Sequence, residues 1–177
     1  ASDVYKRQAL RGAMSESPAP YQPRHRVDVL MAEDSRIQAK MLEKRLVDAG
    51  HTVRWAINGQ KAVELLKEKR PDIIVSDIEM PEMNGYEFCK IVKSSAEWQT
   101  IPLILLSSLS DPVDIIRGLE AGADNYVTKP YESDYLLGRI DSLLDTPLVA
   151  EPPDAGPATE VTVAGQKFRV QAGRQQA

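Results

Sequence analysis

The stretch Ile73-Ile74-Val75-Ser76-Asp77-Ile78-Glu79-Met80-Pro81-Glu82-Met83-Asn84-Gly85 decides the fold of this chain. An apolar run ends in an aspartate, and a loop containing Pro81 and Gly85 follows. Such a run is typical of a strand buried on both faces in the middle of a parallel sheet. In open α/β sheets the functional groups lie just beyond the carboxyl ends of the strands, where we expect Asp77. The alternative is that Asp77 only ends the strand and caps a turn.

Working outward from this stretch, strand patterns alternate with amphipathic helix patterns along the chain. The strands are expected over residues 27–32, 52–56, 72–76, 102–106 and 125–128. Each is followed by a segment with apolar residues at spacings of three and four, which is typical of a helix packed on a sheet. Five alternating strands and helices predict βαβ units and a parallel sheet. The fold class we expect is α/β, a flavodoxin-like doubly wound sheet of order 2-1-3-4-5.

The texture of the sequence divides the chain into four parts. Residues 1–26 lack apolar periodicity and predict a disordered lead-in. Residues 3–8 resemble translated adapter DNA; if they are, Met14 is the natural start and residues 1–13 are not native. Residues 27–145 form the folded domain, and the proline-rich residues 146–159 predict a linker. Residues 160–177 alternate in polarity on both sides of Ala164-Gly165, which predicts a hairpin at the start of a truncated following segment.

Composition narrows the function classes. The chain has 177 residues, a formal net charge of -4 and one cysteine, Cys89. The acidic balance gives no electrostatic support for nucleic-acid binding by this segment. A single cysteine suits a reducing compartment, and no apolar run approaches the roughly 20 residues that span a bilayer. These features predict a cytoplasmic protein without a membrane segment.

Chemically active side chains are expected at the carboxyl ends of four strands. Glu33 and Asp34 end the first, Asp77 the third, Ser107 the fourth and Lys129 the fifth. Taken singly, the acids and the serine are ordinary helix-capping residues and the lysine an ordinary surface residue. Taken together, clustered carboxylates favour a bound Mg²⁺, and an aspartate beside a cation and an ammonium suits phosphoryl transfer.

Residues 27–144 resemble the receiver domain of two-component response regulators, the CheY-like family. The resemblance rests on Glu33-Asp34 and on the runs 77–85, 102–108 and 121–131. It implies that Asp77 accepts a phosphoryl group from a histidine of a partner kinase or its phosphotransfer domain. It further implies that Asp34, Asp77 and the backbone carbonyl of Glu79 bind Mg²⁺, with Glu33 acting through water. Ser107, in place of the commoner threonine, would bond a phosphoryl oxygen, and Lys129 would pair with its charge.

Further expectations concern conformation and output. The Lys129–Pro130 bond is expected to be cis, and Pro81 and Gly85 are expected to shape the loop after Asp77. Ser107 and Tyr126 would form a switch that alters the surface made by the helix after residue 111, strand 125–128 and the last helix. A partner domain, or a second copy in a homodimer, would dock on that surface.

Two questions stay open from the sequence. A Mg²⁺-dependent phosphatase of the haloacid-dehalogenase type also uses an aspartyl nucleophile, but it has Asp-x-Asp after its first strand, whereas here Glu79 stands two positions after Asp77. The parent protein is expected to be a larger regulator or a hybrid histidine kinase with this domain as its N-terminal receiver, and residues 111–125 and the tail resemble the latter.

Overall fold

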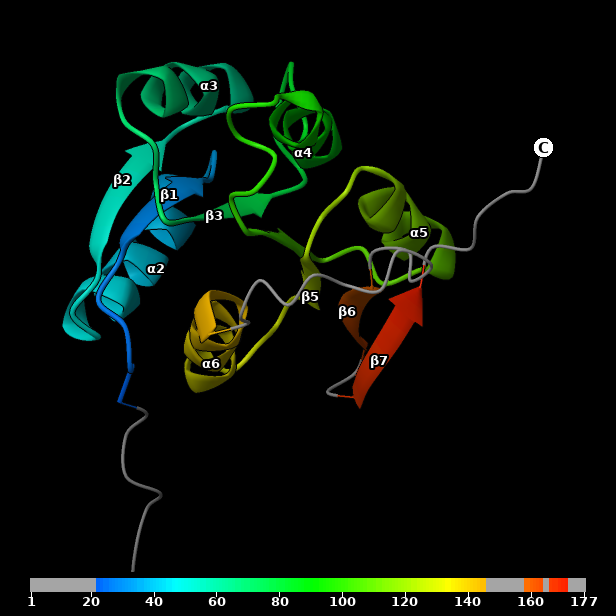
Figure 1. The fold of residues 1–177 in the computed structure, drawn as a ribbon. Coiled ribbons are helices and arrows are strands. Elements are labelled where there is room, and N and C mark those ends of the chain that lie inside the picture. The colour runs from blue at the N-terminus through cyan, green and yellow to red at the C-terminus, as the bar shows by residue number, and fades with distance from the viewer. Residues whose placement is uncertain (1–21, 146–157, 164–165, 172–177) are drawn as a thin grey trace, which may run out of the picture.

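The computed structural model describes residues 22–145, 158–163 and 166–171, and Figure 1 shows their arrangement. In chain order the elements are β1 (Asp28–Ala32), α2 (Arg36–Asp48), β2 (Thr52–Ala56), α3 (Gly59–Glu68), β3 (Ile73–Asp77), α4 (Gly85–Ser94), β4 (Leu103–Ser107), α5 (Pro112–Glu120), β5 (Asn125–Thr128), α6 (Ser133–Asp145), β6 (Ala158–Val163) and β7 (Gln166–Gln171). The predicted alternation of five strands with five helices is confirmed.

The strands form one sheet of order β2-β1-β3-β4-β5-β6-β7. All neighbours from β2 to β6 are parallel, and β7 pairs antiparallel with β6. The predicted order 2-1-3-4-5 is therefore confirmed, and β1 and β3 are neighbours. The sheet also continues past β5 through the hairpin, an extension that periodicity did not predict.

Helices cover both faces of the sheet. Figure 1 shows α3, α4 and α5 on one face and α2 and α6 on the other. Because side chains alternate along a strand, Ile74 and Tyr126 join the core under the first three helices, whereas Ile73 and Val127 join the core under the other two. β3 and β4 are buried at every position, which explains their nearly continuous apolar sequences.

Local sequence explains where the helices begin. Ser35, Asn58 and Asn84 are the N-caps of α2, α3 and α4, and each side chain accepts a hydrogen bond from the backbone N–H three residues on. Asp111 is the N-cap of α5, with Pro112 in the first turn, but its side chain makes no capping bond. There the proline itself fixes the helical start.

Two strands end one residue later than expected. Asp77 lies opposite Leu106, and Ser107 lies opposite Thr128, so both are the last paired residues of β3 and β4. Backbone hydrogen bonds make the parallel pairing, so a polar side chain does not end it. The consequence is that both side chains are held by the sheet, not by a loop.

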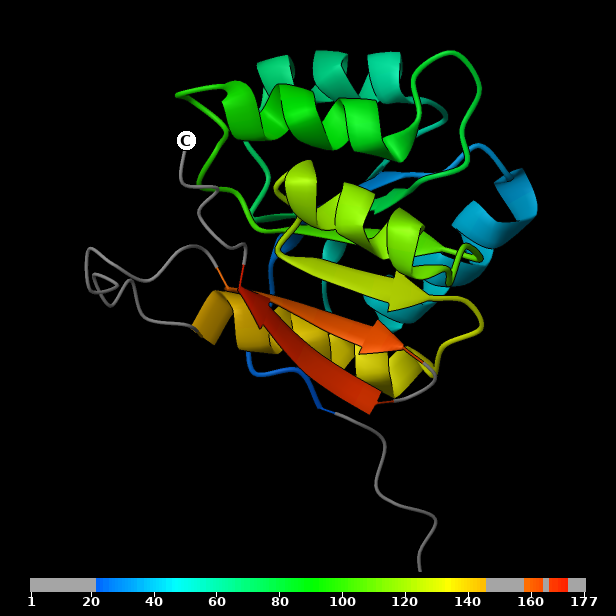
Figure 2. The same cartoon turned by 90° about the vertical axis from the view of Figure 1, so that its right-hand side faces the viewer.

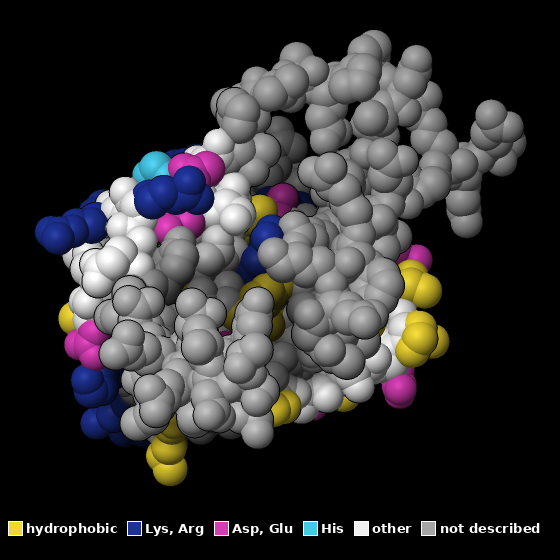
Figure 3. All heavy atoms as spheres, turned by 90° about the horizontal axis from the view of Figure 1, so that it is seen from below, with side chains coloured by type: hydrophobic (Ala, Val, Ile, Leu, Met, Phe, Trp, Pro, Cys, Tyr) yellow, Lys and Arg dark blue, Asp and Glu magenta, His cyan; other side chains and the backbone are white. Residues whose placement is uncertain are grey.

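Residues just before Val27, where the sequence suggested the domain begins, contact α6. The backbone N–H groups of Arg24 and His25 donate to the carboxylate of buried Asp141, at 3.0 and 3.3 Å. Their side chains pair with Asp145 near the end of α6. Figure 3 shows a histidine beside basic and acidic side chains at the surface of this face. Among the described residues, no helix has the length and apolar character needed to cross a membrane.

Candidate functional site

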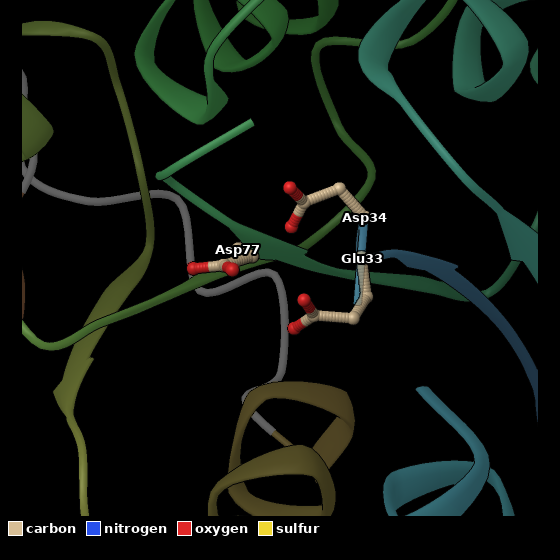
Figure 4. Close-up of side chains that lie close together, drawn as sticks. All are labelled: Glu33, Asp34 and Asp77. Atoms are coloured by element: carbon tan, nitrogen blue, oxygen red, sulfur yellow. The ribbon is translucent and has the colours of Figure 1, made fainter. Parts of the chain in front are cut away.

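The three acidic residues meet where β1 and β3 end. Figure 4 shows Glu33 and Asp34 projecting from the end of β1 toward Asp77 at the end of β3. One oxygen from each carboxylate lies within 4.8 Å of the others. Glu33 and Asp77 are buried, at 4% and 5% exposure, and Asp34 is exposed. Strand order alone brings these residues together, since Asp77 follows Glu33 by 44 positions.

Lys129 supplies the positive charge at this site. Its ammonium lies 3.4 Å from Oδ2 of Asp77 and 3.5 Å from Oε2 of Glu33, and it donates to the Gln38 side-chain carbonyl at 2.8 Å. Its backbone N–H donates to the carbonyl of Ser107 at 2.7 Å, which ties the end of β5 to β4. The Lys129–Pro130 bond is cis, the geometry expected from the sequence.

Burial and like charge perturb the acids. The pKa of Glu33 is raised to about 7: burial is the largest cause and the Asp77 charge adds to it, while the Ser35 N–H and Lys129 oppose the rise. Burial, followed by the charges of Glu33 and Asp77, raises the pKa of Tyr131 to about 12. Among the described residues, the acids of this site pair with the ammonium of Lys129, so ionisation of all three carboxylates leaves an excess of negative charge. A divalent cation with hard oxygen ligands fits this donor set, and Mg²⁺ is such a cation.

Ser107 ends β4, the strand next to β3, and Tyr126 lies on β5 with its ring against α5. Ser107 is fully buried, and its hydroxyl accepts from the N–H of Leu109 at 2.9 Å. The Tyr126 ring is also fully buried, and its hydroxyl donates to the carbonyl of Leu109 at 2.8 Å. The ring packs against Gly118 of α5, where an added Cβ would lie 2.7 Å from Tyr126 Cδ2. Both residues therefore connect to the same short loop after β4.

The loop after Asp77 packs on the backbone of that residue. Ile78 donates its N–H to Oδ1 of Asp77 at 2.8 Å, and Gly85 donates its N–H to the carbonyl of Ile78 at 2.9 Å. A Cβ on Gly85 would lie 2.3 Å from the Asp77 carbonyl oxygen. Only glycine allows this approach of α4. The carboxylate of Glu79 accepts from the Ser108 hydroxyl at 2.7 Å, so its side chain is bonded away from the acids.

Three residues at the site were not predicted from the sequence. Gln38 accepts a hydrogen bond from Lys129, and the indole N–H of Trp55 donates to the carbonyl of Glu33 at 2.8 Å. Tyr131 lies close enough to Glu33 and Asp77 for their charges to raise its pKa. Gln38 stands three residues after the Ser35 cap, a spacing that places it in the first turn of α2. Nothing in the local pattern around Trp55 indicates its partner, because that contact joins two strands.

Comparison with known proteins identifies the family. Residues 29–141 match the family model described as the response regulator receiver domain. The chain belongs to the response regulator receiver domain family. Its acidic cluster is typical of the Mg²⁺ site of receiver domains, and the domain is a phospho-accepting signalling module of phosphorelays, not a classical enzyme.

Relatives include regulators and kinase receivers. The chain is 38% identical over 116 residues to the transcriptional regulatory protein AfsQ1 of Streptomyces coelicolor, covering 66% of this chain and 50% of that protein. It is 43% identical to the crystal structure of the receiver domain of a signal transduction histidine kinase from Syntrophus aciditrophicus, with a TM-score of 0.64, covering 67% of this chain and 89% of that one. CheY4 of Vibrio cholerae is 30% identical with a TM-score of 0.64, covering 67% and 99%. The chain spans about half the length of the curated relatives it matches.

Proposed function

We propose that Asp77 is the residue that receives the phosphoryl group from a histidine kinase or its phosphotransfer domain. The observation that carries this assignment is the position of its carboxylate between Lys129, at 3.4 Å, and the other two acids. Oδ1 already accepts the Ile78 N–H, and Oδ2 faces Lys129, so we assign Oδ2 as the nucleophile. The family membership set out above disfavours the haloacid-dehalogenase alternative.

In the transfer, Oδ2 of Asp77 forms a bond to phosphorus while the N–P bond of the partner's phosphohistidine breaks. The imidazole nitrogen keeps the electron pair and takes up a proton. Lys129 neutralises charge on the phosphoryl oxygens, and Ser107 turns its hydroxyl to donate to one of them. Water later attacks phosphorus, which restores the carboxylate and releases inorganic phosphate.

The same acids would hold Mg²⁺. Asp34 and Asp77 would supply carboxylate oxygens and Glu79 its backbone carbonyl, whereas Glu33, the most buried of the three acids, would act through water. Bound there, Mg²⁺ supplies positive charge to the phosphoryl oxygens and orients them for in-line transfer. A bound Mg²⁺ would add positive charge beside Glu33 and would favour its ionised form against the effect of burial.

For output, we propose that phosphorylation draws Ser107 toward Asp77 and changes the position of Tyr126. Both side chains now bond to Leu109, so moving one alters the loop that leads into α5. The affected surface consists of α5, β5 and α6, on which a partner domain or a second receiver would dock. Val113 and Ile116 of α5 are 67% and 50% exposed, which suits contact with a partner.

Relatives of this domain occur both in transcriptional regulators and in a histidine kinase. We propose a larger regulator or a hybrid histidine kinase as the parent protein, and a cytoplasmic location from its cysteine usage. Sequencing the gene on both sides of this segment tests the first proposal.

The acceptor assignment is tested with acetyl phosphate as donor. Intact mass should rise by one phosphoryl group with Mg²⁺ and not with EDTA, and hydroxylamine should reverse the rise. Asp77→Asn should abolish labelling, whereas Asp72→Asn, at the other end of β3, should leave it unchanged. Labelling of Asp77→Asn as fast as the parent refutes the assignment. The output proposal is tested by adding beryllofluoride and Mg²⁺ and following Tyr126 and α5 by NMR.

A further inference from the structure

The β6–β7 hairpin of this chain pairs with the β5 edge of the sheet. β5 would be the last strand of a five-stranded sheet, yet β6 lies beside it in parallel register, with Asn125 opposite Glu160, Tyr126 opposite Val161 and Val127 opposite Thr162. Figure 2 shows β6 next to β5 and β7 beyond it, both in front of α6. The pairing covers the backbone of β5, which belongs to the proposed output surface.

Pairing with β5 stabilises the hairpin, and it also satisfies backbone groups at the edge of the sheet. β6 and β7 pair along six residues each, joined at residues 164–165. An isolated two-stranded hairpin is marginal in water, whereas the same strands added to a sheet gain a third partner. An exposed strand edge likewise presents unpaired N–H and C=O groups that favour addition of another strand. The chain between β5 and β6 contains α6, which provides a crossover of the kind that a parallel pairing requires.

One feature of β5 weakens the docked state. Asn125 is fully buried, and neither its side-chain oxygen nor its nitrogen has a hydrogen-bond partner within the described part of the chain. A buried polar group without a partner opposes the burial that creates it. Asn125 lies between Ile104 of β4 and Glu160 of β6, so an unpartnered amide adjoins the docked hairpin. If docking contributes to the burial of this amide, the amide opposes the backbone pairing and keeps that pairing reversible.

We propose that the β6–β7 hairpin is an intramolecular ligand of the β5 edge that keeps a second receiver domain off the α5–β5–α6 surface. The exclusion of a second copy rests on the proposed function of that surface, whereas the docking of the hairpin rests only on the strand pairing. If about ten chains are docked for each free one, association that needs two free edges weakens about a hundredfold.

The test compares the parent chain with Val161→Pro/Thr162→Pro. Adjacent residues of a strand donate to opposite neighbours, so this pair removes one donor toward β5 and one toward β7. The matched control is Gln175→Pro/Gln176→Pro, which adds the same two prolines beyond β7. Amide hydrogen exchange of β5 is measured by NMR without any phosphodonor, and self-association by sedimentation velocity with beryllofluoride and Mg²⁺.

In the parent and the control, we expect the β5 amides that face β6 to exchange at least tenfold more slowly than in the Val161→Pro/Thr162→Pro variant. We expect that variant to self-associate about a hundredfold more strongly. Equal exchange in all three proteins overturns the docking of the hairpin. Faster exchange with unchanged self-association overturns the exclusion of a second copy. Failure of the acceptor assignment is recognised separately, because beryllofluoride then alters no variant while the exchange difference remains.

A second variant tests the weak point of the pairing. Asn125→Val removes the unpartnered amide and should slow β5 exchange about tenfold in the parent chain, and less in the Val161→Pro/Thr162→Pro background. An equal effect in both backgrounds shows that the hairpin does not bury Asn125, and contradicts the account of reversible docking given above.

Discussion

Replacing Gly118 by alanine tests what holds the Tyr126 ring in its buried position. Gly118 lies in α5, and an added Cβ would be 2.7 Å from Cδ2 of the ring, 3.2 Å from Cε2 and 3.4 Å from Cδ1 of Leu105. The first distance is far inside van der Waals contact. The ring is fully buried, so it cannot yield without leaving its site or moving the helix.

Two effects of opposite sign decide the result. Alanine in a helix interior is favoured over glycine by about 1 kcal/mol. Overpacking a filled site costs about 1–3 kcal/mol. If the ring moves outward instead, its hydroxyl also loses the bond to the Leu109 carbonyl, a net loss of about 1 kcal/mol. Because the contact of 2.7 Å is so short, we take the upper part of the overpacking range, about 2–3 kcal/mol. After the helix preference of about 1 kcal/mol, we expect Gly118→Ala to lower the free energy of unfolding by about 1–2 kcal/mol, or to expose the ring at a similar cost.

The assay is urea unfolding at equilibrium, together with NMR of the Tyr126 ring. The control is Gly118→Ala in a Tyr126→Ala background, where no ring opposes the new methyl group. There the helix preference acts alone, and we expect stabilisation by about 1 kcal/mol. The interaction between the two sites should thus be about 2 kcal/mol or more. If Gly118→Ala stabilises both backgrounds equally, the ring is not packed on Gly118 and the reasoning fails.

Three further expectations follow from buried groups. Gly85→Ala should lower the free energy of unfolding in urea by about 3 kcal/mol, because the added Cβ would meet rigid backbone at Asp77. Gly59→Ala should lower it by less than about 1 kcal/mol, because the added Cβ would meet the movable side chain of Met83, and equal losses in the two variants would contradict this. Burial lowers the pKa of His51, whose Nδ1 accepts a backbone N–H at 3.2 Å, so the neutral ring stabilises the fold above about pH 6.5. That stability should fall as the pH drops from about 6.5 through the lowered folded-state pKa, and a His51→Gln variant should lack this dependence in urea titrations at pH 5 and 8. Burial raises the pKa of Cys89 to about 12, so a disulfide reagent at pH 8 should label the unfolded chain and leave the folded one unlabelled over the same time.

Much of the site could be predicted because it depends on local pattern and strand order. The apolar runs before Asp77 and Ser107 identify central strands, since only strands covered on both faces are apolar throughout. Once the order 2-1-3-4-5 is inferred, Glu33 and Asp34 must lie beside Asp77, because parallel strands bring their carboxyl ends to one edge. The acidic cluster is therefore a consequence of the sequence.

The tertiary structure decided the contacts that no period encodes. Gln38 and Lys129 are 91 positions apart, and their hydrogen bond depends on where the first turn of α2 lies relative to the end of β5. The close packing of Tyr126 on Gly118 depends on the distance of α5 from the sheet. The alternation around Ala164-Gly165 predicted a hairpin, but its partner is β5, across a helix and a linker. Alternation specifies which side chains share a face of a strand, and the backbone groups at a sheet edge pair with any strand that reaches them, so only the assembled fold determines which one does.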